Sequence, residues 1–224
     1  RLTLLTKDSD AYNRWDASQQ LMLASFEKIA FQKQDPTDEL INAFCQIMQD
    51  QKLMPAFRAQ LLSQPSISEI IAHFFENNLP IDPEMIYTAK KIFSQKLAES
   101  SNQFLEQLFH SLTQNVKYEP SADQVGERSL KNILLGLLTR VDNGESSRKQ
   151  FSRADNMTDE VAALSVLIQN DLVSTEIDSF YERWADDRLV IDKWFMLQTS
   201  LSQPSKSLEI TKTLANHSDF NKKN

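Results

Sequence analysis

The scarcity of glycine is the feature that most constrains the fold of this chain. Its 224 residues contain only three glycines. Hairpins and tight turns normally use glycine because it adopts positive φ angles at no steric cost, so a fold rich in β-sheet is disfavoured. The seven prolines fall between segments of periodic apolar residues, where they separate helices rather than interrupt them. The sequence therefore predicts an all-helical protein.

The size and charge of the chain narrow its class further. With 41% hydrophobic residues, a chain of this length can bury roughly 70% of its unfolded surface, in one large domain or two tight subdomains. Its formal net charge of -7 provides no attraction to a phosphate backbone. No apolar run approaches the ~18 residues of a membrane span, and the N-terminus is not organised as a signal peptide. We expect no nucleic acid and no membrane as partner.

The single cysteine, Cys45, lies in an apolar stretch. One cysteine cannot form an internal disulfide, and these surroundings are typical of a small core residue. We therefore expect a buried structural thiol rather than a nucleophile. This cysteine usage favours a reducing compartment, and we expect a cytoplasmic location.

The first residues depart from the helical pattern. Leu2–Thr6 are β-prone and are followed by the turn-like residues 7–10. They predict one short strand, whose pairing partners would lie outside this sequence.

From Asn13 onward, apolar residues recur at helical spacing, and several helix starts are marked. Thr37 begins the second helix, Pro55 suits the first position of the third, and Ser66 and Glu69 have the spacing of a capping box. Each of these signals satisfies or removes backbone N–H groups that a helix start leaves unpaired.

The longest helical pattern begins at Asp82 and continues to about Asn115. Its length predicts either one long helix or two helices that join near Ser100 and Ser101. Further helices are expected from Ser121, after Gly144, from Asn156 or Thr158, and over about 177–184, 190–200 and 205–217.

About ten amphipathic helices with short loops must stack on one another, because most are too short to persist alone. The expected fold is all-α, a superhelix or solenoid-like stack of antiparallel helix pairs with one short strand-like segment at the N-terminus. No fixed sequence period is present, so any repeat would be structural.

Metal chemistry has little support in the residues. A zinc site needs three convergent His, Cys or carboxylate ligands. His73, His110 and His217 are isolated in the sequence, and His73 has one acid, Glu76, three residues on. We interpret His73 as a helix-end histidine beside a surface acid. Phosphate-binding loops and nucleophile elbows need more glycines than this chain has, so we expect no catalytic and no metal-binding residue.

Three segments combine charged or capping residues with large aromatic side chains. Each could serve as a cap or half-buried anchor, or could hold an interface, because Trp and Arg concentrate where a partner excludes water. These candidate interface or structural anchors are Arg14, Trp15, Asp16, Asn156, Thr158, Asp159, Asp192, Lys193 and Trp194.

The same three segments carry a resemblance to a known family. Asn13–Ala17, Asn156–Asp159 and Asp192–Phe195 occur in the order and at about the separations found in the C-terminal helical region of bacterial aminopeptidases N, which are zinc exopeptidases. The similarity spans nearly the whole chain. The chain resembles part of that helical domain.

The resemblance implies a parent enzyme that releases N-terminal amino acids from peptides. It would consist of an N-terminal β domain, a thermolysin-like domain with His-Glu-x-x-His, a small β-sandwich and the helical part. Residues 1–10 would be the end of the β-sandwich or a linker, and residues 11–224 the helical C-terminal domain, truncated before its end.

The implied partners are the catalytic domain of the same full-length chain and, through the parent, peptide substrates. The helical part would cap the active-site cavity. The zinc and its ligands would belong to the catalytic domain, so no cofactor is expected in this fragment. Family members continue beyond a segment like residues 217–220 with further helices that face the cavity, so most cavity-lining residues are expected to be missing here.

Two other functions stay open from the residues alone. One is an independent helical-repeat adaptor for protein–protein interaction, and the other is a stand-alone enzyme that uses scattered acid pairs. An upstream His-Glu-x-x-His would support the aminopeptidase, whereas a start codon just before Arg1 would support the adaptor.

Overall fold

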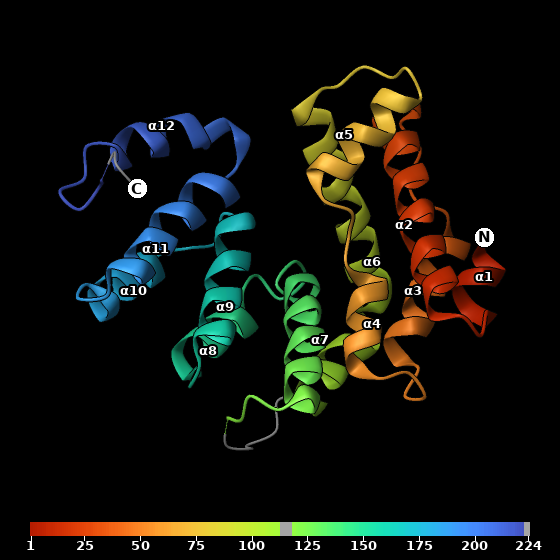
Figure 1. The fold of residues 1–224 in the computed structure, drawn as a ribbon, viewed down its shortest axis with the longest axis horizontal. Coiled ribbons are helices and arrows are strands. Elements are labelled where there is room, and N and C mark those ends of the chain that lie inside the picture. Colours follow the sequence, from red (N-terminus) through yellow and green to blue (C-terminus); the bar gives the residue numbers. More distant parts are fainter. Residues whose placement is uncertain (113–117, 222–224) are drawn as a thin grey trace. The chain divides into compact units, whose positions relative to one another are not determined.

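The computed structural model describes residues 1–112 and 118–221. The chain forms two compact units, Arg1–Val141 (unit 1) and Asp142–Asn224 (unit 2), and each is described by itself. Every regular element in the described ranges is a helix, and none is a strand (Figure 1). The all-α prediction is therefore confirmed. The boundary expected between residues 10 and 11 stays a prediction.

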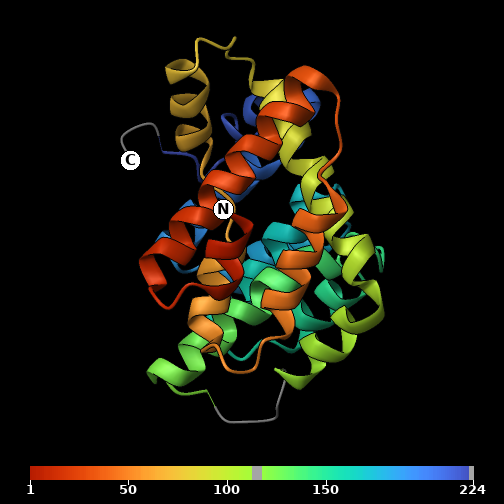
Figure 2. The same cartoon turned by 90° about the vertical axis from the view of Figure 1, so that its right-hand side faces the viewer.

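The predicted strand at the N-terminus is wrong, because Leu2–Lys7 form helix α1. Leu5 is 0% exposed, and its carbonyl accepts a hydrogen bond from Arg14 Nε on α2 at 2.9 Å. A lone strand would leave its backbone groups without partners, whereas a helix pairs them internally and buries Leu5. Helix α1 packs against α2 in both views (Figures 1 and 2).

Unit 1 is built from seven α-helices and one π-helical turn among its described residues. Helix α2 continues directly into the π-helical turn, which ends at Lys33 in the left-handed conformation, with φ of 55°. Their bounds are α1 Leu2–Lys7, α2 Ala11–Glu27, the π-helix Lys28–Gln32, α3 Asp38–Gln49, α4 Pro55–Leu62, α5 Ile67–Glu76, α6 Pro83–Ser111 and α7 Ala122–Leu138.

The predicted starts of α3, α4 and α5 are confirmed at their capping residues. Thr37 Oγ1 accepts from Leu40 N at 3.4 Å, and Pro55 is the first residue of α4. Ser66 and Glu69 form the complete capping box, with bonds of 3.2 and 2.7 Å. These local bonds pair backbone N–H groups that would otherwise lack partners, so the signal is independent of tertiary packing.

Helix α6 is a single continuous helix of 29 residues. Ser101 does not divide it, because its Oγ donates to Leu97 O at 2.7 Å and is thereby satisfied within the helix. The expected end near Asn115 lies outside the described residues.

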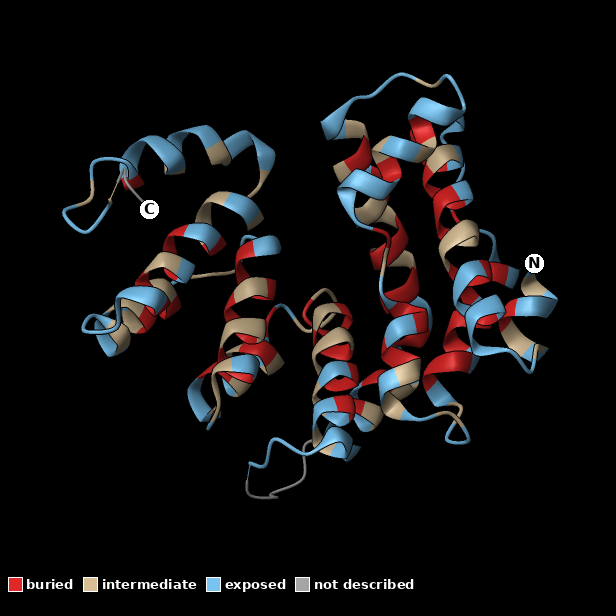
Figure 3. Cartoon of the chain, viewed as in Figure 1, coloured by how far each residue is buried: buried red, intermediate tan, exposed pale blue. Residues whose placement is uncertain are grey.

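The core of unit 1 centres on phenylalanines from three helices. Phe93 of α6 packs edge-to-face on Phe26 of α2 and Phe44 of α3, with ring centroids 5.5 and 5.7 Å apart. All three are buried. Buried residues, drawn red in Figure 3, occur along the helices of this unit. Helices α4 and α7 approach closely, because a Cβ placed on Gly126 would lie 3.1 Å from Ala56 Cβ.

Unit 2 contains five helices among its described residues, in which α8 packs on α9, α10 on α11, and α11 on both α9 and α12. Asn156 rather than Thr158 caps α9, because its side chain accepts from Asp159 N at 3.0 Å. The bounds are α8 Glu145–Arg153, α9 Met157–Gln169, α10 Glu176–Trp184, α11 Arg188–Leu201 and α12 Pro204–Leu214. Over residues 1–112 and 118–221, no helix combines the length and apolarity needed to cross a bilayer.

Candidate functional site

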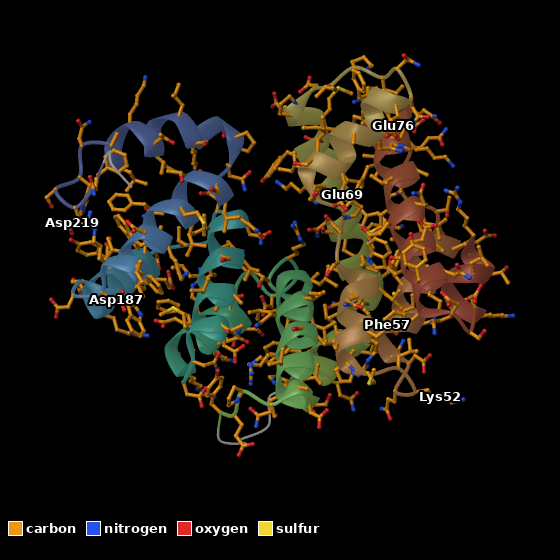
Figure 4. The ribbon with its side chains drawn as sticks, viewed as in Figure 1. Lys52, Phe57, Glu69, Glu76, Asp187 and Asp219 are labelled. Carbon is orange, nitrogen blue, oxygen red and sulfur yellow. The ribbon has the colours of Figure 1, made fainter. Side chains whose placement is uncertain are left out.

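The first candidate segment divides into an inward and an outward part. Arg14 is buried: besides its bond to Leu5 O, its guanidinium lies 5.7 Å from the ring centroid of Phe57, labelled in Figure 4. Trp15 and Asp16 of the next two positions are exposed. Arg14 therefore holds α1 and α4 to α2, as a structural anchor does.

Trp15 is 36% exposed and pairs with exposed Tyr12, with ring centroids 5.7 Å apart. Leu4 of the adjacent α1 is also exposed. Two neighbouring aromatic side chains at a surface are the kind that anchor interfaces, because they bury large area at low entropic cost.

The second segment is a helix cap. Besides capping α9 with its carbonyl oxygen, Asn156 donates through Nδ2 to Asp159 Oδ2 at 3.1 Å. Asp159 is buried, its backbone carbonyl accepts from Gln150 of α8 at 3.0 Å, and Thr158 is exposed. Asn156 and Asp159 thus fix the start of α9 against α8.

The third segment contains the main aromatic anchor of unit 2. Trp194 is buried, and its Nε1 donates to Ile177 O on α10 at 3.0 Å. Asp192 is half-buried and Lys193 is exposed. The second and third segments meet the same helix, since Glu160, next to Asp159, accepts from Trp184 Nε1 of α10 at 3.1 Å.

Trp194 belongs to a ring cluster that joins α10, α11 and the turn after α12. The His217 ring centroid lies 5.3 Å from those of Tyr181 and Trp194 and 5.5 Å from that of Phe195. The Tyr181 hydroxyl donates to Asp219, labelled in Figure 4, and this bond raises the pKa of Tyr181. The sequence analysis placed His217 at the end of a helix over 205–217, whereas α12 ends at Leu214 and His217 lies in the turn that follows. The helical pattern therefore did not predict this cluster.

A polar pocket of about 410 Å³ lies beside this cluster. It opens between the α10–α11 connection, the first turn of α11 and the turn that follows α12. Three acidic side chains and one arginine contribute to its lining, which consists of Ala185, Asp186, Arg188, Ile191, Asp192, Ser218, Asp219, Phe220 and Asn221.

Two buried acids of unit 2 are held by arginines and were not predicted. Glu160 is 3% exposed and accepts from Arg183, and Glu176 is buried with Arg148 Nε 3.4 Å away. Burial alone would raise the pKa of Glu176, but hydrogen bonds from Ser174 and the charge of Arg148 outweigh it and lower that pKa. Glu160 shares a face with Leu164 and Leu167 of α9, and this spacing could have revealed an inward acid.

The histidines and the cysteine offer no metal centre in the part of the chain described. His73 Nε2 lies 3.0 Å from Glu27 Oε2, so its acidic neighbour comes from α2 rather than being Glu76. Within residues 1–112 and 118–221, no three His, Cys, Asp or Glu side chains gather as metal ligands would. Cys45 is buried as expected, and burial raises the pKa of its thiol.

Comparison with known proteins assigns this helical architecture to a family. The model of the family described as "Domain of unknown function (DUF3458_C) ARM repeats" matches residues 1–224. ARM repeats are stacked helices, which agrees with the solenoid-like stack of helix pairs expected from the sequence.

Curated relatives include aminopeptidases N. Those of Escherichia coli (strain K12) and Caulobacter vibrioides are each 29% identical, over 100% and 98% of this chain, and that of Haemophilus influenzae is 28% identical over 98%. The chain spans 26% of the length of these relatives.

A solved structure, that of Legionella pneumophila aminopeptidase A in complex with aspartic acid, matches 98% of this chain and 27% of its own chain at 25% identity, with a TM-score of 0.83. The resemblance to aminopeptidase N stated from the sequence motifs is thus confirmed. The chain belongs to the DUF3458_C family of ARM-repeat domains.

Proposed function

We propose that this chain is the helical, non-catalytic domain of a zinc aminopeptidase that releases N-terminal amino acids from peptides, and that it caps the active-site cavity of its own polypeptide. The observation that supports this most is the end-to-end match to aminopeptidases N, of which the chain spans only 26%. The remaining length of such a protein would carry the catalytic domain.

The charged side chains of the chain fit a scaffold role. The buried acids Glu160 and Glu176 are bonded to arginines of unit 2, and such pairing leaves them unsuited to proton transfer. The described residues do not fit a zinc ion, since they bring no three ligands together. The zinc would therefore be held by the catalytic domain, and we derive no chemical step from this chain.

The candidate anchors separate into two roles under this proposal. Arg14, Asn156, Asp159 and Trp194 hold helices of the chain together by the bonds described above. The exposed residues of the same segments are proposed to meet the catalytic domain of the full-length chain: Trp15, Asp16, Thr158 and Lys193, with Asp192 half-buried at the edge. We also propose a cytoplasmic location, with which the free thiol of Cys45 is compatible.

A reconstitution experiment tests the proposed function. The upstream part of the gene product is expressed with and without this chain, and hydrolysis of aminoacyl-anilides and of peptides of increasing length is followed. We expect no turnover by this chain alone, and we expect its presence to restrict long peptides more than short ones, because a cover limits access to an enclosed site.

Chelator-sensitive turnover by the chain alone would overturn the non-catalytic assignment. A gene that begins just before Arg1 and has no upstream His-Glu-x-x-His would overturn the aminopeptidase proposal and leave the helical-repeat adaptor in its place.

A further inference from the structure

The turn that precedes α8 contains the only Asn-Gly pair of the sequence, Asn143-Gly144. Both residues have positive φ, 55° and 81°, and Glu145 N donates to Asp142 O at 3.3 Å. These values correspond to a type I′ turn, in which Asn-Gly is a favoured pair. Asn143 is exposed, so water reaches its side chain.

An Asn-Gly pair has a reaction of its own. The Gly144 nitrogen can lose its proton and attack Cγ of Asn143, the Cγ–Nδ2 bond breaks, and ammonia leaves. The resulting succinimide then adds water at either carbonyl and opens to aspartate or isoaspartate. Glycine favours this reaction because it places no side chain beside the attacking nitrogen and leaves the backbone free to rotate.

The folded turn opposes each requirement of this reaction. The Gly144 N–H donates to Asp142 Oδ1 at 2.9 Å, and the negative carboxylate disfavours the deprotonated nitrogen that must attack. Ring closure also needs rotation about the Cα–C bond of Asn143. That rotation would break the bond from Arg148 Nη1 to Asn143 O, which measures 2.9 Å.

Further contacts of the turn hold its backbone conformation. Asp142 Oδ2 also accepts from Ser146 N at 2.8 Å in the first turn of α8, and Gly144 is buried against Leu167 and Leu172. An isoaspartate at position 143 would add one carbon to the main chain, which these contacts leave no room for.

We propose that Asn143 is a latent deamidation site, which the carboxylate of Asp142 protects in the folded chain and which reacts when the turn opens. Deamidation to isoaspartate would then mark chains whose turn has opened and would prevent the turn from forming again. The site needs water and no other reagent.

The test measures conversion of Asn143 by peptide mapping and mass spectrometry after incubation at neutral pH. Wild type is compared with D142A, D142N and E145Q, each folded and in urea. We expect deamidation of folded D142A to be about ten-fold faster than that of folded wild type, the order expected when a hydrogen bond to a charged group is lost. D142N retains an acceptor without the charge and should lie between them, and E145Q, which leaves the Gly144 bond in place, should match wild type.

Equal rates for folded and urea-unfolded wild type would overturn the proposal, as would a folded D142A that reacts no faster than wild type. Circular dichroism establishes whether D142A is folded. If it is not, D142N decides: faster conversion than wild type supports the protective carboxylate, and an equal rate contradicts it.

Discussion

Unit 1 and unit 2 bury opposite charges. Among the described residues, the buried charged side chains of unit 1 are Arg14, Arg58 and Lys131, whereas those of unit 2 are Asp159, Glu160 and Glu176. For Arg14 and Arg58 of unit 1 and for the three acids of unit 2, the sign of the charge matches the nearby helix end, because the negative end of the helix dipole is at its C-terminus and the positive end at its N-terminus.

The two buried arginines of unit 1 bond to main-chain carbonyls. Arg14 reaches Leu5 O in the last turn of α1, and Arg58 Nη1 reaches Met48 O in the last turn of α3, at 2.9 Å. Helix C-termini leave such carbonyls without intrahelical donors. The partner of each arginine is therefore a backbone atom that no substitution removes.

The acids of unit 2 lie in the first turns of α9 and α10, and Glu160 and Glu176 bond to arginine side chains. One substitution can remove either partner of such a pair. The buried arginines of unit 1 thus depend on backbone acceptors, whereas the buried Glu160 and Glu176 of unit 2 depend on side-chain pairs that mutation or acid can break.

The largest effect is expected in the apolar core of unit 1. F93A removes the ring that contacts Phe26 and Phe44, and it should lower the free energy of unfolding by about 4 kcal/mol. Urea unfolding followed by circular dichroism measures the loss. F75A is the matched control, since Phe75 is 72% exposed and its truncation should change stability by less than about 0.5 kcal/mol. Equal losses for the two variants would contradict the described core.

Lys90 gives unit 1 a stability that rises with pH. Burial lowers its pKa from 10.5 to about 8, against the opposing charge of Glu69, labelled in Figure 4. The folded state therefore releases the proton before the unfolded state does, so stability is fully present above pH 10.5 and is lost as the pH falls towards 8. The free energy of unfolding is expected to change by about 3 kcal/mol over this pH range.

The difference between wild type and K90M, measured by urea unfolding across this pH range, isolates the contribution of Lys90. It should grow with pH in favour of wild type. A difference that does not change between pH 8 and 10.5 would show that Lys90 is solvated in the folded chain.

Substitution of Glu160, the buried acid of unit 2 that Arg183 holds, should cause a smaller loss of stability. E160Q removes the charge that Arg183 faces while it keeps an acceptor for Trp184, and we expect about 2 kcal/mol of destabilisation. The partial exposure of Arg183, 44% of its side chain, keeps this value below that of a fully buried pair. Tryptophan fluorescence during urea unfolding reports the loss, and exposed Glu182 provides the control variant E182Q. If E160Q and E182Q lost the same stability, unit 2 would not depend on its buried acid–arginine pair, and the proposed difference between the two units would be wrong.

The smallest expected effect is a weak decrease in the stability of unit 2 at acidic pH. The pKa of Glu176 is lower in the folded state than in the unfolded state. Its contribution to stability is therefore present above the pKa of the unfolded state and is lost as the pH falls through the pKa of the folded state. E176Q should abolish this part of the acid dependence. A slope that persists in E176Q would assign it to other acids.

The sequence allowed the helices and most of their starts to be predicted, because capping bonds such as those of Thr37 and Ser66 form between residues a few positions apart. It failed at Leu2–Thr6, where β-propensity was overridden by burial of Leu5 against α2. Tertiary contacts decide such short segments, and no local pattern reveals them.

The candidate site was predicted less completely. The inward roles of Trp194 and Asp159 fit their helix positions, but the Tyr181–His217 contact joins residues far apart in the chain. The pairs of Glu160 and Glu176 with arginines likewise depend on how α8, α9 and α10 pack. Side-chain partners across such separations follow from the fold and not from spacing.

The close approach of Gly126 to Ala56 has a consequence for the order of assembly. These two residues are 70 positions apart in sequence, and α4 contacts α7 more extensively than it contacts α2 or α3. A ribosome releases α4 well before α7, so the side of α4 that faces α7 stays uncovered while the intervening residues are made. Completion of unit 1 during synthesis must therefore wait for α7.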